Sequence, residues 1–418
     1  MAANIRLGLG ANVGQFALLV GVNALVGAMV GQERSILPLL AEREFGLTSA
    51  SATLTFLVAF GLAKAFANLA AGALADRYGR KPVLVAGWIV AVPVPLLIIV
   101  APDWSWVVLA NVLLGVSQGL TWSTTVIMKV DLVGPARRGL ALGLNEAAGY
   151  IAVAAAALAT GLIAEVAGLR PAPFFLGLAI AGLGLGASAL FVRETRGHAA
   201  LESGASEVAA APVRPGWRTV VRRTSIGDRR LFAASQAGLV NNLNDGMAWG
   251  LLPLFFASRG LPVVEIAILA ATYPAVWGVL QIGTGAWSDH VGRRPLIVIG
   301  MLMQAVAIGV IAMGDGFVTW LIAAAGLGVG TALVYPTLIA VVADVAAPSW
   351  RASAIGVYRL WRDLGFAVGA ILSGLVADAA GMPAAIWLVA ALTGLSGVVA
   401  AAVLVETRPR TEVTPPLG

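Results

Sequence analysis

The chain contains the stretch Gly72-Ala-Leu-Ala-Asp76-Arg77-Tyr78-Gly79-Arg80-Lys81-Pro82. This stretch returns 213 positions later as Gly285-Ala-Trp-Ser-Asp289-His290-Val291-Gly292-Arg293-Arg294-Pro295. The same offset pairs Asp131 with Asp344 and Gly143 with Gly356, so the register holds over much of both halves. A charged loop that repeats at so long a period, between apolar segments, indicates a duplicated membrane protein.

The composition points to the same class of protein. Hydrophobic residues make up 59% of the 418 residues and charged residues only 11%, and the mean hydropathy is +0.90. A helix that crosses a bilayer needs about 20 mostly apolar residues. The sequence therefore predicts an all-α membrane protein with twelve transmembrane helices. The expected spans are 14–40, 49–75, 81–101, 104–130, 138–167, 171–192, 229–257, 262–287, 294–314, 317–344, 351–380 and 383–404.

These spans divide the chain into three parts. Residues 1–192 form one expected six-helix bundle, and residues 229–418 form a second bundle with a short tail. The segment 193–228 between them is rich in Ala, Pro, Gly and Arg, and contains no apolar run long enough to cross a bilayer. We interpret it as a polar linker.

The positive charges predict the orientation, because short loops retained in the cytoplasm carry an excess of Lys and Arg. If both termini are cytoplasmic, 19 of the 27 Lys and Arg residues lie on the cytoplasmic side. These are Arg6, Arg77, Arg80, Lys81, Arg137, Arg138, the eight arginines from Arg193 to Arg230, Arg293, Arg294, Arg351, Arg408 and Arg410. Only Arg43, Arg170 and Arg259 face the other side. The basic charge is thus explained by topology in an inner membrane and by lipid contact, not by nucleic-acid binding.

Other classes of site have little support in the sequence. The chain has no cysteine, which excludes disulfides and thiolate metal sites. No phosphate-binding G-x-x-x-x-G-K-[ST] loop, cofactor motif or nucleophile elbow is present, which disfavours an ATP-driven pump and an enzyme. We expect no bound cofactor or metal.

The repeated loop resembles the signature of the major facilitator superfamily, G-x-L-a-D-r-x-G-r-[RK], between the second and third helices and again between the eighth and ninth. Glu194-Thr195-Arg196 and Glu406-Thr407-Arg408 also resemble the family's E-T-[RK] signal after the sixth and twelfth helices. The matching positions are Gly72, Asp76, Arg77, Gly79, Arg80, Lys81, Gly285, Asp289, Gly292, Arg293 and Arg294. The resemblance covers nearly the whole chain apart from the linker, and implies a monomeric transporter that alternates access between two bundles.

The repeated loop has both an anchoring and a possible gating role. Gly79 and Gly292 permit a tight reversal, and the basic residues hold the loop in the headgroup layer. In this fold Asp76 can face the start of the helix near Arg351, and Asp289 the start of the helix near Arg137. A carboxylate at a helix N-terminus is favourable. We expect two latches that hold the cytoplasmic side shut; the alternative is a loop that only fixes the topology.

Charges within the spans are costly unless they are paired or hydrated. Lys64 lies twelve residues before Asp76, and Asp363 lies twelve residues after Arg351. Both are therefore about 18 Å from the cytoplasmic face, on helices that abut in this fold. The sequence predicts that Lys64 and Asp363 contact each other across the two halves.

The same depth argument places Arg359 beside Asn68 and Glu146 beside Gln281. Glu146 and Arg359 occupy equivalent positions with opposite charge, as expected if the repeat has diverged along a substrate path. These residues, with Arg362, are candidates for coupling or for contacts between the bundles; the alternative is that they fix the helix register.

The cavity of this fold is lined by the first, fourth, seventh and tenth helices. In this chain they supply hydrogen-bonding groups beside flat aromatic surface, which suits an organic solute. The polar and aromatic candidates are Asn23, Gln32, Glu33, Arg34, Gln118, Trp122, Asn241, Asn242, Asn244, Asp245, Trp249 and Tyr335.

The expected function is secondary transport of a small solute, driven by a proton gradient. The candidates for the titrating carboxylate are, in order, Asp245, Glu146, Asp363 and Glu33. The chain departs from drug:proton antiporters, because their fourth-helix arginine is replaced by Asn111 or Gly115 and their Gly-Pro pair in the fifth helix is absent. Export by antiport is the preferred expectation, and the alternatives are uptake by symport, uniport, and a receptor or scaffold that has lost transport.

Overall fold

The computed structural model describes residues 6–134, 138–206, 215–347 and 350–407. The described residues of the first half form helices α1 (Val13–Arg34), α2 (Leu37–Arg43), α3 (Ala50–Thr53), α4 (Thr55–Tyr78), α5 (Arg80–Ala91), α6 (Pro93–Val100), α7 (Trp104–Val133), α8 (Arg138–Ala167) and α9 (Ala172–Leu190). Those of the second half form α12 (Arg229–Ala248), α13 (Leu251–Ser258), α14 (Val263–Val291), α15 (Arg293–Met313), α16 (Phe317–Val345), α17 (Arg351–Ala380) and α18 (Met382–Val403).

The described part of the linker also contains helical segments. They are α10 (Arg196–Ser206), α11 (Trp217–Arg222) and a π-helical turn, η2 (Arg223–Gly227). None of the three is long enough to cross a bilayer. Val220 of α11 is buried, so this part of the linker packs against the second half.

The all-α membrane fold is confirmed. Within the described residues, eleven helical stretches are long and apolar enough to cross a membrane. They correspond to all the predicted spans except 229–257. That span is formed by α12 and α13, and its first helix carries Asn241, Asn242, Asn244 and Asp245 in its buried part. The polar side chains lower its hydropathy, although it packs within the second half beside α17 and α18.

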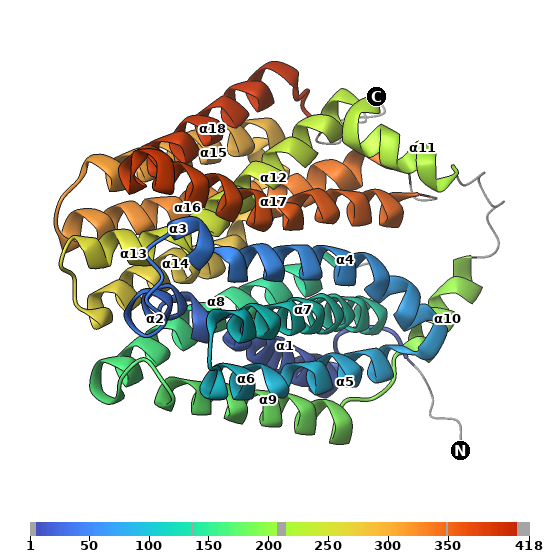
Figure 1. Cartoon of the computed structure of the whole chain (residues 1–418). Coiled ribbons are helices and arrows are strands. Elements are labelled where there is room, and N and C mark those ends of the chain that lie inside the picture. The colour runs from blue at the N-terminus through green and yellow to red at the C-terminus, as the bar shows by residue number, and fades with distance from the viewer. Residues whose placement is uncertain (1–5, 135–137, 207–214, 348–349, 408–418) are drawn as a thin grey trace.

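Figure 1 shows the two halves side by side, with the blue-to-green helices below and the yellow-to-red helices above. The principal contacts between the halves join α4 to α17 and α8 to α14. The helices run roughly parallel to this interface. We call the end that carries the repeated loops and the linker segments α10 and α11 the linker end, and the opposite end the far end.

Two predicted spans are interrupted at equivalent places. The first breaks between Arg34 and Leu37, just before Pro38, and the seventh breaks at Trp249 and Gly250, before Pro253. Proline has no N–H to donate and disfavours helical backbone at the residue before it. Each half therefore begins with a helix in two pieces, which the predicted continuous spans did not include.

The tight reversal predicted for the repeated loop is confirmed. Gly79 ends α4 with a φ of 99°, and Gly292 ends α14 with a φ of 108°. Only glycine adopts this backbone region readily. Substitution at either position would strain the loop.

The E-T-R sequence and the repeated loop form one structural unit in each half. The Glu194 carboxylate accepts hydrogen bonds from the backbone N–H groups of Arg80 and Lys81 at 3.0 and 2.9 Å. The Glu406 carboxylate accepts from the N–H groups of Arg293 and Arg294 in the same way, at 2.9 and 3.2 Å. Both carboxylates thus satisfy the free N–H groups at the start of a transmembrane helix.

We expect Glu194→Gln to destabilise the protein by about 1 kcal/mol, as the loss of a helix cap does. Partial burial acts to raise the pKa of Glu194, but hydrogen bonds from Lys81, Arg80 and neighbouring N–H groups outweigh it and hold the pKa below the ordinary 4.5. A group with a depressed pKa stabilises the fold above its unfolded pKa. The difference in melting temperature should therefore be full at neutral pH and shrink as the pH falls below 4.5. Glu42→Gln, on an exposed surface, is the control; an equal effect there would contradict the assignment.

Candidate functional site

Glycines pack the two halves together from the middle of the interface to the far end. A Cβ atom placed on Gly61 of α4 would lie 2.9 Å from the Ala367 nitrogen of α17. A Cβ atom on Gly278 of α14 would lie 3.0 Å from Ile151 of α8. Nearer the far end, Gly161 of α8 meets Ala267 and Gly374 of α17 meets Ser51 at less than 3.0 Å. The helices approach so closely that no side chain fits between them.

The same helix faces are unpacked toward the linker end. Gly72 lies three turns from Gly61, and Gly143 lies five turns from Gly161, so each shares the face of its partner. A Cβ atom on Gly72 or Gly143 would meet no described atom within 4 Å, and Gly356, five turns from Gly374, is equally free. The interface is therefore closed at the far end and open toward the linker end.

Polar contacts add to the closure of the far end. The Asp378 carboxylate of α17 accepts hydrogen bonds from the Ser49 hydroxyl at 2.8 Å, the Ala50 N–H at 2.6 Å and the Ser51 hydroxyl at 2.5 Å. On the other side of the interface, Glu165 of α8 accepts from the Val264 N–H of α14 at 3.3 Å. These contacts join the two halves and must break if the far end opens.

A polar pocket lies between the halves where the packed and open parts of the interface meet. Its empty volume is about 270 Å³. We call it the central pocket, and it is lined by Lys64, Asn68, Trp122, Tyr150, Tyr335, Arg359, Arg362 and Asp363. Six of these residues were predicted as cavity or coupling residues: Lys64, Trp122, Tyr335, Arg359, Arg362 and Asp363.

The predicted contact between Lys64 and Asp363 is confirmed. The Lys64 Nζ atom lies 4.0 Å from Asp363 Oδ1, and the Asp363 residue is only 1% exposed. Asn68 donates a hydrogen bond to the other oxygen of Asp363, and Arg362 Nη1 lies 3.4 Å from Oδ1. Asn68 and Arg359 line the same pocket, as the depth argument predicted. One carboxylate thus faces two cations from opposite halves.

Glu146 makes the second link across the interface. Its carboxylate accepts hydrogen bonds from Trp122 Nε1 and from the Tyr335 hydroxyl of the second half, both at 2.9 Å. Arg362 completes the connection, because it donates to the Tyr150 hydroxyl at 2.8 Å and lies 4.1 Å from the centre of the Tyr335 ring. Gln281, which the depth argument placed beside Glu146, makes no hydrogen bond with it, because its side-chain amide has no hydrogen-bond partner among the described residues. Trp122 and Tyr335 supply the donors instead.

The rings of Trp122, Tyr150 and Tyr335 line the central pocket, and Trp277 packs against two of them. Tyr150 lies 3.5 Å from Trp277 and 5.4 Å from Trp122, measured between ring centres. Trp277 lies 5.5 Å from Tyr335, edge to face. Such surfaces hold flat organic groups and also bind cations. The pocket therefore combines flat apolar walls with charged groups of both signs.

Two predicted cavity residues of the first half do not line the pocket. Asn23 is buried, donates to the Asn145 carbonyl at 2.7 Å and accepts from the Thr125 hydroxyl at 2.8 Å. Gln118 donates to the Val26 carbonyl at 2.8 Å. Buried amides need partners, and the hydrogen bonds that these two make lie within their own bundle. The prediction that they line the cavity is wrong for this structure.

The same correction applies to two asparagines of the second half. Gln304 Nε2 donates to Asn241 at 3.1 Å, and Asn244 donates to Gln304 Oε1 at 2.9 Å. Thr393 of α18 donates to Asn244 at 2.7 Å. Asn241 and Asn244 belong to a hydrogen-bond network that joins α12, α15 and α18 inside the second half.

Four other predicted cavity residues lie beside the helix breaks. Glu33 and Arg34 are fully buried at the end of α1, and Asp245 and Trp249 are buried at the end of α12. Asp245 accepts a hydrogen bond from the Tyr273 hydroxyl. Arg34 lies 5.4 Å from the Trp249 ring centre, so this group also crosses between the halves.

Sequence reasoning missed Tyr150, Tyr273 and Trp277 as site residues. Tyr150 lies four residues after Glu146 and therefore shares its helix face, a signal that could have identified it. Tyr273 and Trp277 have the same spacing on α14, but that helix was not counted among the cavity helices. Trp277 lies at the interface because α14 packs directly on α8, and Tyr273 lies beside Asp245 within the second half.

In this structure, the gating aspartates contact arginines of their own loops. Asp76 lies 3.0 Å from Arg80, and Asp289 lies 2.6 Å from Arg293. Their side chains are 76% and 61% exposed, as expected when the linker end is open. Arg137, where the second latch was expected, lies outside the described residues, as do Arg214, Arg408 and Arg410. The latches stay a prediction for a state in which the linker end is closed.

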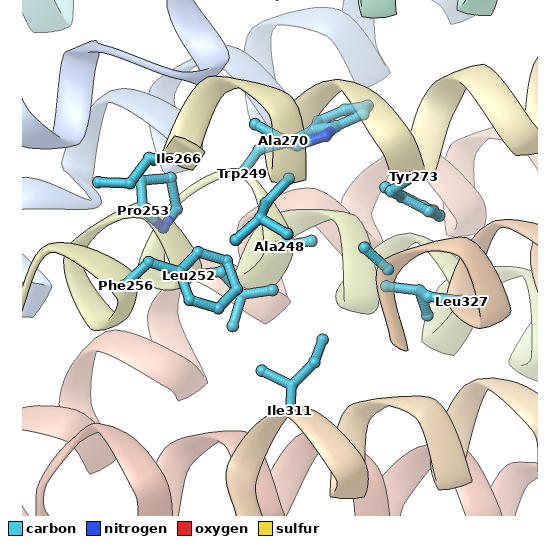
Figure 2. A pocket seen from close by; sticks show the side chains of 12 residues that line it. Ala248, Trp249, Leu252, Pro253, Phe256, Ile266, Ala270, Tyr273, Ile311 and Leu327 are labelled. Atoms are coloured by element: carbon cyan, nitrogen blue, oxygen red, sulfur yellow. The ribbon is translucent and has the colours of Figure 1, made fainter. Parts of the chain in front are cut away.

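A second cavity lies within the second half and is apolar. Figure 2 shows Trp249, Leu252 and Tyr273 on its sides, with Ile311 and Leu327 opposite Trp249. Its empty volume is about 370 Å³. We call it the apolar pocket.

Comparison with known proteins gives the family. A family model described as Major Facilitator Superfamily matches residues 16–242 and 234–418. Quinolone resistance protein NorA of Staphylococcus aureus (strain MRSA252) is 23% identical over 136 residues, which is 32% of this chain and 35% of the relative. Fosmidomycin resistance protein of Escherichia coli (strain K12) is 25% identical over 173 residues, 41% of this chain and 42% of the relative. The matches thus span well under half the length of these relatives.

Solved structures share the fold over nearly the whole chain. A POT family transporter in complex with 5-aminolevulinic acid superposes with a TM-score of 0.74 and 12% identity, covering 93% of this chain and 95% of that one. The nucleoside transporter NupG superposes with a TM-score of 0.70 and 14% identity, covering 93% and 99%. With the repeated loop, the paired bundles and the family match, the chain is a multi-pass membrane protein that belongs to the major facilitator superfamily.

Proposed function

We propose that the protein moves a small organic solute across the cytoplasmic membrane by alternating access, with proton-coupled export as the direction and mode. The observation that carries this proposal is the central pocket. It holds buried charges from both halves and lies where the packed and the open parts of the interface meet. A pocket of this kind is the arrangement expected of a carrier that exposes one site to each side in turn.

The charge distribution supports a cytoplasmic linker end. The repeated loops and the described residues from Arg193 to Arg230 carry eleven of the 24 arginines, whereas only Arg43, Arg170 and Arg259 lie in loops or helix ends at the far end. Positive loops are retained in the cytoplasm. In this orientation the structure is the inward-facing state, with both termini cytoplasmic.

Export is favoured by the names of the relatives. One is named for resistance to quinolones and another for resistance to fosmidomycin, and removal of a drug from the cell is one physical route to resistance. The aromatic walls of the central pocket suit a flat organic solute. Export therefore ranks above uptake for this chain.

Proton coupling is supported by three carboxylates at the interface. Asp363 faces cations from both halves, Glu146 accepts hydrogen bonds from both halves, and Asp245 lies at a helix break. Protonation of such a group would weaken its contacts across the interface, so proton binding and the rocking of the halves would be linked. The solute and the proton can then exchange through the same set of contacts.

The proposal can be tested in proteoliposomes with an imposed pH gradient and a labelled compound panel that includes a quinolone. We expect the wild type to drive solute counter to proton flow, and Asp245→Asn to lose the gradient-driven part of the flux by at least about tenfold. Glu265→Gln, at the far end of α14, is the control and should transport normally. Flux in the same direction as protons would indicate symport, and flux that ignores the gradient would indicate uniport.

A further inference from the structure

Arg34 is a buried cation without hydrogen-bond partners. It is 0% exposed, and its Nε, Nη1 and Nη2 atoms all lack a hydrogen-bond partner among the described residues. A guanidinium group carries five N–H donors in a planar fork that fits an oxyanion. Burying such a group without partners is costly. The cost is understandable if the donors are kept for a ligand.

Aromatic rings flank this guanidinium, and two buried carboxylates, Glu33 of its own helix and Asp245 of the other half, act on it electrostatically. Its Cζ atom lies 4.5 Å from the ring centre of Phe60 and 5.4 Å from that of Trp249, which comes from the other half. Phe366 stacks on Trp249 at 5.6 Å and meets Phe60 edge to face at 5.7 Å. Lys64 lies 5.6 Å from the Phe60 ring centre, on the same aromatic layer. The Arg34 site is therefore separated by a layer of rings from the central pocket.

Asp245 supplies a buried acceptor close by. Its Oδ1 atom accepts from Tyr273, but its Oδ2 atom has no hydrogen-bond partner among the described residues. Asp245 lies one helical turn before Trp249 and so shares the face that the ring presents to Arg34. The two charges are near enough to act on each other, although no ion pair joins them within 4.0 Å in the described residues. The free donors of Arg34 thus lie near a free acceptor of the opposite half, Asp245, as well as near the Glu33 carboxylate of their own helix.

The apolar pocket adjoins this pair of charges. Trp249 and Tyr273, the two rings that contact Arg34 and Asp245, also line it (Figure 2). The remaining lining is aliphatic or aromatic, with Leu252 and Leu327 among it. A ligand with its charged groups at Arg34 and Asp245 could place an apolar group on the other side of the Trp249 ring.

The backbone at this place is that of a transport site. Arg34 precedes the break between α1 and α2, and Trp249 lies at the break between α12 and α13. The offset of the repeat, 213 residues, places Ile36 opposite Trp249, so the two breaks are equivalent. Interrupted helices at the interface of two repeats are where carriers expose backbone groups to a solute.

We propose that Arg34 and Asp245 bind a zwitterionic solute, with the carboxylate on Arg34, the ammonium group on Asp245, and an apolar side group in the apolar pocket. The proposal rests on the proposed transport function, and it names the class of solute for a second site that lies beside the central pocket. A zwitterion can pair with both charged groups at once. A simple anion would be repelled by the carboxylate of Asp245, and a simple cation would be repelled by the guanidinium of Arg34. Because the site is sealed in this structure, the solute reaches it when the halves rock apart at the far end.

The test uses three matched probes and equilibrium binding to the full chain in lipid nanodiscs. Tritiated phenylalanine is the reporter. Unlabelled phenylalanine, phenylalaninamide, which lacks the carboxylate, and hydrocinnamate, which lacks the amine, are the competitors. In the wild type we expect phenylalanine to compete at concentrations at least about tenfold lower than either analogue, since each analogue leaves one buried charge unpaired.

Replacing either charged residue should remove the preference for phenylalanine over the analogue that lacks the matching charged group. Arg34→Gln should make phenylalanine no better than phenylalaninamide, and Asp245→Asn should make it no better than hydrocinnamate. Arg34→Lys, which keeps the charge but not the fork, should bind phenylalanine at least about threefold more weakly than the wild type. Arg43→Gln removes the same charge from an exposed position on α2 and should bind like the wild type.

Several results would overturn the inference. No binding of phenylalanine to the wild type would do so, as would equal loss of all three probes in Arg34→Gln with the protein still monodisperse on size exclusion. If Arg34→Gln does not fold, an unchanged affinity in Arg34→Lys would overturn it. Gradient-driven flux of other compounds would survive any of these results, so failure of this inference is distinct from failure of the transport proposal.

Discussion

Asp363→Asn is expected to abolish transport. Asp363 is almost fully buried and faces Lys64 at 4.0 Å and Arg362 at 3.4 Å. Removing one partner of a buried ion pair leaves the other charge uncompensated, which costs about 3–5 kcal/mol. Here two cations from opposite halves lose their shared anion in the pocket where the solute is expected to bind. Both the stability of this state, which is open toward the linker end, and the proposed binding site should suffer.

The measurement is flux in proteoliposomes together with melting temperature in detergent. Asp315→Asn, whose carboxylate is exposed at the far end and 3.9 Å from Arg259, is the control and should change neither. The double variant Lys64→Gln and Asp363→Asn removes both members of the pair. We expect it to regain part of the lost stability, because fewer charges remain unpaired, but not the transport.

That double variant separates two roles of the pair. If Lys64 and Asp363 only fix the position of α4 against α17, removing both should restore flux to nearly the wild-type rate. If Asp363 also binds the solute or a proton, flux stays absent although the protein is stable. Recovery of flux would therefore contradict the coupling role that we assign to Asp363.

The contact between Lys64 and Asp363 could be predicted from the sequence because it depends only on the depth of each residue along its helix. Lys64 and Asp363 each lie a known number of residues from a landmark at the linker end, and α4 and α17 are unbroken over that distance. A rise of 1.5 Å per residue then gives the depth reliably. The repeated loop identified the family, and the fold of that family predicts which helices are neighbours. The depth of two residues, together with the knowledge that their helices are neighbours, predicts that they are in contact.

The direction of a side chain around its helix was harder to predict. Asn241 and Asn244 lie on a cavity helix, yet they point toward Gln304 and stabilise the second half. Tyr150 was overlooked although it binds Arg362. A polar residue in a transmembrane helix can face either the cavity or a buried network within its bundle, and composition does not distinguish them. The spans are also interrupted before Pro38 and Pro253, so a straight helix does not predict where the residues after each break point.

The sequence could not give the conformational state either, because both states share one set of residues. The packing around glycines at the interface shows which state this structure represents. Gly61 and Gly374 are packed against the opposite half, whereas Gly72 and Gly356 on the same faces are free of contact within 4 Å in the described structure. The interface is packed at the far end and open toward the linker end, and cross-linking can test whether the two ends open in turn.

A covalent bridge at the far end is expected to stop transport completely. The Ser51 hydroxyl and the Asp378 carboxylate come within 2.5 Å across the interface, and the chain has no native cysteine to interfere. Ser51→Cys combined with Asp378→Cys, joined by a short thiol-reactive cross-linker, should hold the far end shut. A carrier that cannot open one end cannot complete its cycle. Flux should return when a cleavable linker is reduced, and each single variant treated in the same way should keep its own untreated rate.

The linker end should behave in the opposite way. Cysteines at Gly72 and Gly356 lie on faces that are apart in this structure, so a short linker should join them only when the linker end closes during transport. Asp76→Asn should then lower the yield of that cross-link, because the expected latch to the start of α17 loses its charge. If the far-end bridge leaves flux intact, or if the Gly72–Gly356 pair cross-links equally well with the far end bridged, the two ends are not alternately open. Alternating access would then be the wrong description of this chain, whatever solute it binds.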